Sequence, residues 1–305
     1  MTKVSNFYEA KNLSEAIFQL KNISELNIVG GCTQICHEQN GDFFDLPGNI
    51  LCLKNIDELT NFSRTERRLE FGAATPLAKI ENRASSGKIP GVLLEAIKSI
   101  ATPAIRNFAT IGGNICSPGC KKTLYAPLLA LDAILEFKND KETKLVPMQK
   151  FEEQFASLLP QLNLSEFFKD FITENPEAKE KRRYLLSKVI VPLQPWTLEH
   201  FSRFNRDSYG NEYGFSLAIL VRDEKGVVSD FRIALAGAFV FRDRDLENFI
   251  VGSKLPLSPK FVSHFMAKTE ERFDEVFKTA DFCFYQMDKT RFLNSIRNVV
   301  KGLMI

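Results

Sequence analysis

The strongest chemical signal in the sequence is Arg106-Asn-Phe-Ala-Thr-Ile-Gly-Gly-Asn114. Its two adjacent glycines let another group approach the backbone closely, because neither carries a Cβ atom. Successive backbone N–H groups in such a turn can form a concave anion-binding nest. Thr110 and Asn114 add side-chain donors beside the pair. The pattern is compatible with an anion site, although a glycine pair taken alone is more typical of an ordinary tight turn.

A second glycine pair has the same character. Gly30-Gly31-Cys32-Thr33 follows Asn27-Ile-Val29, which is typical of a short buried strand. Two nests could hold the two phosphates of a pyrophosphate. Neither pair matches G-x-G-x-x-G or the G-x-x-x-x-G-K-[ST] phosphate loop, which excludes both standard nucleotide motifs.

The composition is that of a globular protein. The chain has 305 residues, enough for two domains and a large core. Hydrophobic residues make up 44% and charged residues 26%, which excludes a disordered chain, a collagen and a coiled coil. The net charge of +2 gives no general attraction to nucleic acid. The 27 Phe residues are predicted to fill the core.

Nothing in the sequence points to a membrane or to secretion. No apolar run reaches the roughly 18 residues of a membrane span, and the first residues lack the apolar core of a signal peptide. We therefore expect a cytoplasmic protein with no membrane partner. In that compartment the six cysteines are expected to be thiols rather than disulfides. They are Cys32, Cys36, Cys52, Cys116, Cys120 and Cys283.

Hydrophobic spacing predicts alternating helices and strands along the whole chain. Residues 1–60 are predicted as a helix over 12–21, capped by Ser14, followed by β-turn-β with strands near 27–32 and 50–53. The next unit is predicted to hold strands at 68–73 and 133–137, helices at 75–82 and 92–100 and from Tyr125, and a loop at 101–122. Later segments are predicted as a charged helix or linker at 150–183, strands at 186–192, 214–221 and 227–237, a hairpin turn at 223–226, and helices at 259–267, capped by Ser258, and at 288–303.

A longer stretch carries a family resemblance. Ala101–Ile115, followed by Ser117-Pro118 and Leu128-Leu-Ala-Leu-Asp-Ala133, closely resembles the FAD-binding subunit of the molybdenum hydroxylases. That family includes the medium chains of xanthine dehydrogenase and of aerobic carbon monoxide dehydrogenase. Further similarity lies in Ile28-Val-Gly-Gly-Cys-Thr-Gln34, Leu69–Leu77, Leu185–Pro192, Phe215–Ala218 and Arg232–Gly237.

The resemblance implies an α+β protein with two domains. An FAD-binding fold of two α/β subdomains (about 1–60 and 61–192) would span residues 1–192, and a C-terminal α/β domain of the molybdopterin-dehydrogenase flavin-subunit type would span 193–305. The two glycine loops would grip the FAD pyrophosphate, with hydrogen bonds from Thr110 and Asn114. Ile100 and Leu186 would contact the flavin. The implied cofactor-binding residues are Ile28, Val29, Gly30, Gly31, Cys32, Thr33, Gln34, Ile100, Thr110, Ile111, Gly112, Gly113, Asn114 and Leu186.

The resemblance also implies partners. Electrons would arrive from iron–sulfur centres on a [2Fe–2S] small subunit and leave through FAD to NAD or another acceptor. A large subunit would hold the molybdenum cofactor and choose the substrate, so no catalytic residue is assigned to this chain. The protein would orient and tune the flavin, whose chemistry is its own.

The sequence departs from the family pattern in three places. No acid follows Ser117-Pro118, where the family has an Asp and this chain has Gly119-Cys-Lys-Lys122. Gln34 replaces an acid of the first loop, and Cys32 stands where a smaller or polar residue is usual. Asn205 occupies a position where some relatives have Lys.

These departures keep other functions open. One is a scaffolding subunit that has lost FAD. Another is a metal or iron–sulfur site, because the two loops should converge and bring Cys32, Cys36, Cys116 and Cys120 together. A third is an unrelated FAD oxidoreductase of the enolpyruvyl-reductase type, against which the Arg106–Asn114 motif argues. The scattered histidines and the lack of G-x-S-x-G make a zinc or serine hydrolase a poor match.

Overall fold

The computed structural model describes residues 6–24, 26–38, 48–83, 89–117, 123–151, 184–204, 214–237, 240–278 and 286–304. Most of the predicted charged segment at 150–183 lies outside these residues, as do Pro118, Cys120, Asn205 and Cys283. The chain forms two compact units. Unit 1 comprises Met1–Ile89, Ile100–Pro118 and Asp132–Leu193, and unit 2 comprises Pro90–Ser99, Gly119–Leu131 and Gln194–Ile305.

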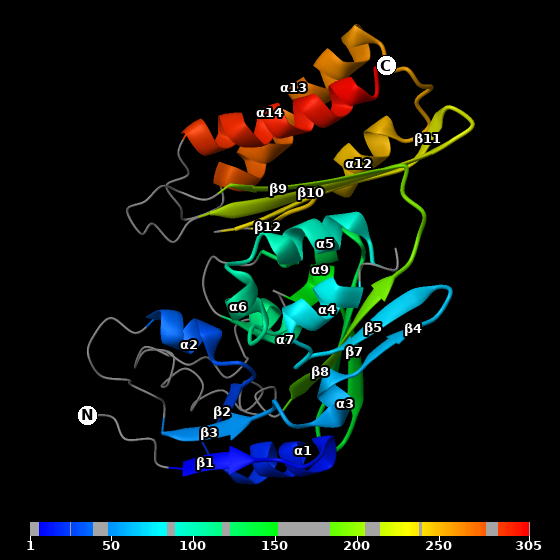
Figure 1. Cartoon of the computed structure of the whole chain (residues 1–305). Coiled ribbons are helices and arrows are strands. Elements are labelled where there is room, and N and C mark those ends of the chain that lie inside the picture. Colours follow the sequence, from blue (N-terminus) through cyan, green and yellow to red (C-terminus); the bar gives the residue numbers. More distant parts are fainter. Residues whose placement is uncertain are drawn as a thin grey trace. The chain divides into compact units, whose positions relative to one another are not determined.

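Unit 1 begins with a small parallel sheet in the order β1-β3-β2 (Figure 1). Its strands are β1 (Asn6–Glu9), β3 (Asn49–Cys52) and β2 (Leu26–Val29), joined by helices α1 (Leu13–Asn22) and α2 (Thr33–Glu38). The prediction of β-turn-β was wrong, because β2 and β3 are parallel and a parallel pair needs a crossover connection. The carboxyl ends of all three strands therefore lie at one edge of this sheet.

The start of α1 differs from the prediction. Asn12, rather than Ser14, is the N-cap, and its side-chain oxygen accepts a hydrogen bond from the Glu15 N–H at 2.9 Å. Both residue types are good caps, so the spacing of the apolar residues alone did not fix which of them begins the helix.

The second sheet of unit 1 is antiparallel, in the order β4-β5-β8-β6-β7. Its central strand β8 carries Leu186 and is buried over most of its length, as the apolar run predicted. Helices α3 (Asp57–Thr60), α4 (Leu77–Arg83) and α9 (Met148–Phe151) belong to the same unit. The strands are β4 (Phe62–Arg64), β5 (Arg68–Gly72), β8 (Leu185–Pro192), β6 (Ile134–Lys138) and β7 (Thr143–Pro147).

The predicted loop at 101–122 contains two short helices instead. Helix α6 (Pro103–Arg106) starts with Thr102 as its cap and a proline in its first turn. Helix α7 (Ile111–Cys116) starts with Thr110 as its cap, so the second glycine pair lies inside a helix. Glycine is a poor helix former, and in α7 the threonine cap and tertiary contacts outweigh that preference.

Unit 2 is built on the antiparallel sheet β12-β11-β10-β9. In the predicted hairpin between β10 and β11, Lys225 (φ 53°) and Gly226 (φ 73°) form the turn, as a two-residue hairpin loop requires. One face of the sheet packs against α12, α13 and α14, and the other against α5 and α8 (Figure 1). These elements are β9 (Leu198–Phe204), β10 (Phe215–Glu224), β11 (Val227–Ala236), β12 (Val240–Phe241), α5 (Gly91–Lys98), α8 (Tyr125–Ala130), α12 (Arg244–Ile250), α13 (Pro259–Lys278) and α14 (Gln286–Gly302).

The core of unit 2 is rich in phenylalanine, as predicted. Phe241, Phe273 and Phe292 are fully buried and lie in mutual ring contact at centroid distances of 4.6 to 5.9 Å. Phe231 and Phe265 form another such pair at 5.7 Å. Edge-to-face and offset contacts of this kind add stability beyond the burial of the rings.

Charged side chains of the same sheet hold both ends of helix α5. Glu199 accepts a hydrogen bond from the Val92 N–H at 2.8 Å at the start of the helix, and Arg203 donates to the Ser99 carbonyl at 2.5 Å at its end. At the end of α8, Arg232 donates to the Ala130 carbonyl at 3.0 Å. An acid at a helix N-terminus and bases at C-termini complement the helix dipole, so these contacts fix α5 and α8 on the sheet.

Glu247 anchors the opposite face of this sheet. The carboxylate accepts hydrogen bonds from the Ile233 N–H and the Arg242 Nε, both at 3.0 Å, and the Arg242 and Glu247 side chains are only 2% and 3% exposed. Removing one partner of a buried ion pair leaves the other charge uncompensated.

We expect Glu247→Ala to lower the free energy of unfolding by about 3–5 kcal/mol. The control is Asp245→Ala on the same helix, which removes a carboxylate that is 77% exposed and should cost about 1 kcal/mol or less. Urea denaturation followed by circular dichroism measures both. Equal losses for the two variants would contradict the role of Glu247.

Candidate cofactor-binding site

The two glycine loops lie against each other within unit 1. A Cβ atom built on Gly31 would lie 1.8 Å from the Phe108 carbonyl oxygen, so only glycine allows this approach. A Cβ atom on Gly30 would lie 3.0 Å from the Thr110 hydroxyl oxygen. The structure therefore brings the predicted residues of both loops together. The first pair of glycines allows the two loops to contact each other closely.

The second glycine pair is anchored from within the protein. The Ile111 N–H donates to the Thr75 carbonyl at 3.1 Å and the Gly112 N–H to the Ala73 carbonyl at 2.8 Å. The Gly113 N–H donates to the Thr110 hydroxyl at 3.0 Å, and the Asn114 N–H donates to the Thr110 carbonyl at 3.0 Å. The backbone N–H groups expected to form a free nest at Gly112 and Gly113 are thus already engaged.

The first loop keeps its backbone donors. Within the part of the chain that the structure describes, no acceptor receives a hydrogen bond from the N–H groups of Gly31, Cys32 or Thr33. Cys32 adopts a left-handed conformation with φ 57°, which is uncommon for a residue other than glycine. Consecutive N–H groups around such a residue form the nest geometry that binds anions.

The position of this loop in the sheet is typical of ligand sites. Gly30 and Gly31 follow the carboxyl end of β2, and the Leu53 N–H, at the carboxyl end of β3, donates to the Val29 carbonyl at 2.9 Å. Ligands of parallel α/β sheets bind outside this edge. Ile28 and Val29 lie in β2 itself, and Gln34 lies in the first turn of α2.

Arg106 is a functional candidate that the sequence reasoning missed. Its guanidinium is buried, donates to the carbonyls of Ile100 and Ala101 at 3.0 and 3.1 Å, and pairs with Glu81 at 2.9 Å. Ala101 has a φ of 45°, a strained value that these contacts stabilise. The Arg of the Arg106–Asn114 motif therefore positions Ile100, one of the two predicted flavin contacts.

Leu186, the other predicted flavin contact, is linked to the second glycine pair through Ala73. The Ala73 N–H donates to the carbonyl of Ser187, the residue after Leu186, at 3.0 Å. A Cβ atom on Gly112 would lie 2.6 Å from the Ala73 carbonyl oxygen. Gly112 thus lets α7 pack directly on this segment beside β8.

The cysteines of the described residues are free thiols. Burial, with smaller contributions from Cys52 and Cys36, raises the pKa of the Cys32 thiol. Burial raises the pKa of Cys116 to about 12. No three His, Cys, Asp or Glu side chains of the described ranges come together as a metal site. Of the four cysteines considered for a cluster, Cys120 lies outside those ranges.

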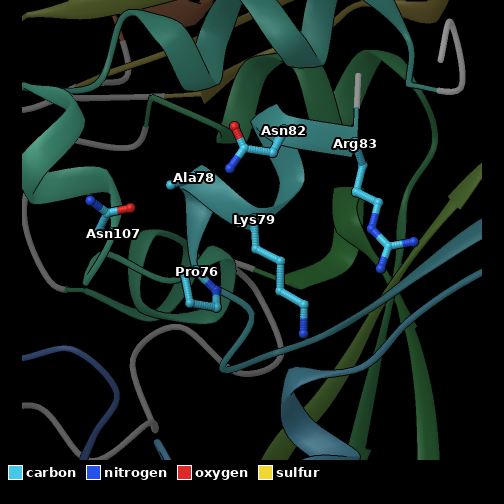
Figure 2. A pocket seen from close by; sticks show the side chains of 6 residues that line it. All are labelled: Pro76, Ala78, Lys79, Asn82, Arg83 and Asn107. Carbon is cyan, nitrogen blue, oxygen red and sulfur yellow. The ribbon is translucent and has the colours of Figure 1, made fainter. Parts of the chain in front are cut away.

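A pocket of about 330 Å³ lies elsewhere on unit 1 (Figure 2). Asn107 reaches it from the end of α6, and the other lining residues lie on α4 or just before it. Its two cations already have partners, because Lys79 donates to the Thr60 carbonyl at 2.8 Å and the Arg83 guanidinium lies 5.5 Å from the Phe62 ring centroid. None of the predicted cofactor-binding residues lines this pocket.

The fold is of the α+β class, with open backbone donors at the carboxyl ends of a parallel sheet. Residues 2–194 match the family model described as "FAD binding domain in molybdopterin dehydrogenase". The chain therefore belongs to that family, and FAD is its cofactor. No helix among the described residues combines the length and apolar character needed to cross a bilayer.

Curated relatives agree with this assignment. The chain is 31% identical to the xanthine dehydrogenase FAD-binding subunit of Escherichia coli O157:H7 over 50% of this chain and 52% of that protein. It is 24% identical to the nicotine 6-hydroxylase medium subunit of Paenarthrobacter nicotinovorans over 77% of each chain. The chain thus spans about half the length of the first of these relatives.

Solved structures confirm the predicted fold. Carbon monoxide dehydrogenase from Hydrogenophaga pseudoflava superposes with a TM-score of 0.74 at 17% identity, over 100% of this chain and 98% of the other. Quinoline 2-oxidoreductase from Pseudomonas putida 86 gives a TM-score of 0.73 at 15% identity over 100% of both chains.

The residues present fit an FAD pyrophosphate at the first loop. The open N–H groups of Gly31, Cys32 and Thr33 are the donors that a diphosphate requires, and the Thr110 hydroxyl beside Gly30 can still donate its proton. The second loop supports the first loop, which packs against Phe108 and Thr110.

We expect Gly31→Ala to separate the two loops, because the new Cβ meets backbone that cannot move aside. The variant should lose about 1–3 kcal/mol of stability and bind FAD at least tenfold more weakly. The control is Gly302→Ala in α14, where a Cβ meets nothing within 4 Å, and which should be neutral or slightly stabilising. Thermal denaturation and flavin fluorescence titration measure both effects. Unchanged FAD affinity in folded Gly31→Ala would contradict the site.

Thiol labelling tests the description of the cysteines. At pH 7.5 we expect iodoacetamide to modify exposed Cys36 first and Cys32 and Cys116 much more slowly, because a raised pKa leaves little reactive thiolate. Peptide mass spectrometry follows each site, and labelling in guanidinium supplies the control in which all sites react alike. Equal rates for Cys36 and Cys116 in the native protein would contradict the raised pKa of Cys116.

Proposed function

We propose that this chain is the FAD-binding electron-transfer subunit of a molybdenum hydroxylase complex. The observation that carries the proposal is the set of open N–H groups at Gly31, Cys32 and Thr33, in a domain that belongs to an FAD-binding family. Bound FAD supplies the chemistry of hydride and single-electron transfer. The protein contributes binding, orientation and the exclusion of water.

The geometry supports the following roles for individual residues. The N–H groups of the first loop and the Thr110 hydroxyl bind the pyrophosphate. Asn114, half-buried on α7, adds a side-chain amide. Leu186 and Ile100 provide apolar surface for the flavin, and Arg106 holds the backbone that carries Ile100.

The other redox centres of the complex lie on other chains. A large subunit holds the molybdenum cofactor, and a small subunit with [2Fe–2S] clusters passes electrons to this chain, which delivers them to NAD or another acceptor. Residues 1–192 form the FAD-binding domain and 193–305 the C-terminal domain of this subunit. The free thiols among the described cysteines support a cytoplasmic location.

We expect the purified chain to bind one FAD per polypeptide, with the absorption bands of an oxidised flavin that NADH bleaches without oxygen. Because the pyrophosphate is bound, ADP-ribose should compete with FAD, and riboflavin should bind at least a hundredfold more weakly. Equilibrium dialysis and absorption spectroscopy measure these quantities. A colourless chain that does not bind added FAD would contradict the proposal and favour a scaffolding subunit. Bound FAD that NADH does not bleach would exclude only NAD as the electron acceptor.

A further inference from the structure

Two side chains of opposite character meet beside the first glycine loop. The Lys54 ammonium lies 5.5 Å from the centroid of the Phe108 ring. Phe108 is 53% exposed, although its backbone carbonyl is in contact with Gly31. Neither residue belongs to the set that the sequence predicted for cofactor binding.

The fold brings the pair to the ligand edge of the parallel sheet. Lys54 follows the end of β3, directly after Leu53. The Leu53 N–H donates a hydrogen bond to the Val29 carbonyl of β2. Phe108 lies between α6 and α7, where the Phe108 and Ala109 N–H groups close the turn on the Ile105 carbonyl at 3.0 and 2.8 Å. Both backbones are thus held, and both side chains are exposed.

Both side chains are exposed to solvent and accessible to a ligand. Lys54 is exposed, and within the described residues its ammonium has no carboxylate partner and lies over the Phe108 ring alone. Phe108 is exposed, and its backbone lies against the loop that carries the three open N–H donors. An aromatic ring, a free cation and backbone donors in one place are the parts that bind a planar base joined to a diphosphate.

We propose that Lys54 and Phe108 bind the ADP half of FAD. The Phe108 ring stacks on the adenine, and the Lys54 ammonium pairs with the pyrophosphate that the first loop holds. This inference rests on the proposed function and adds two residues to it.

The test uses the full chain carrying Phe108→Leu, Lys54→Gln or both. Since both side chains are exposed, each variant should melt within a few degrees of the wild type. We expect Phe108→Leu to weaken ADP and FAD binding about tenfold, in line with the loss of one stacked base, and to leave riboflavin binding unchanged. Lys54→Gln should weaken FAD binding and flatten its dependence on salt concentration. Calorimetry with ADP and fluorescence titration with FAD give the affinities.

Matched controls are Phe18→Leu on α1, which removes a Phe that is 65% exposed, and Lys260→Gln on α13; both should bind as the wild type does. Wild-type affinity for ADP and FAD in the double variant would overturn the inference while leaving the proposed function intact. A wild-type chain that binds ADP through Phe108 but not FAD would contradict the proposed function and overturn the assignment of the pair to FAD. A wild-type chain that binds neither would overturn both.

Discussion

The site depends on the missing Cβ of Gly31. Because the backbone of Gly31 can lie against the Phe108 carbonyl, the loop after β2 rests on the segment between α6 and α7. Any larger residue would place a carbon atom 1.8 Å from that oxygen, well inside van der Waals contact. Two segments separated by more than seventy positions in sequence thereby become one surface, with the donors of the first loop on its open side.

The two glycine loops consequently have different roles. In the second loop, glycine permits packing: Gly112 approaches Ala73, and the N–H groups at the start of α7 are consumed by Thr75, Ala73 and Thr110. In the first loop, glycine permits both the contact with Phe108 and a turn whose N–H groups stay open. We propose that the second loop supports the site and the first loop binds the cofactor, although each sequence is a glycine pair after an apolar run.

Much of the fold was predictable because its signals are local. The alternation of β10 and β11, the Lys225-Gly226 turn and the apolar run of β8 each follow from neighbouring residues, and the Arg106–Asn114 motif identified the family. The parallel pairing of β2 with β3 was missed because strand order is a tertiary property. The short helices α6 and α7 were missed because a few residues with two glycines carry no helical period. Arg106 binds the nearby Ile100 and Ala101 carbonyls and pairs with Glu81, and Lys54 meets Phe108 only in the folded chain. These contacts depend on tertiary structure, so no local pattern could assign them.

Amide hydrogen exchange, resolved residue by residue by NMR with and without FAD, tests this division of roles most directly. We predict that Gly112, Gly113 and Asn114 are protected in the flavin-free chain and change little on binding. Gly31, Cys32 and Thr33 should exchange rapidly without FAD and become protected when it binds. Fast exchange at Gly112 and Gly113 that FAD alone suppresses, with no change at Gly31–Thr33, would contradict the account and return the anion site to the second loop.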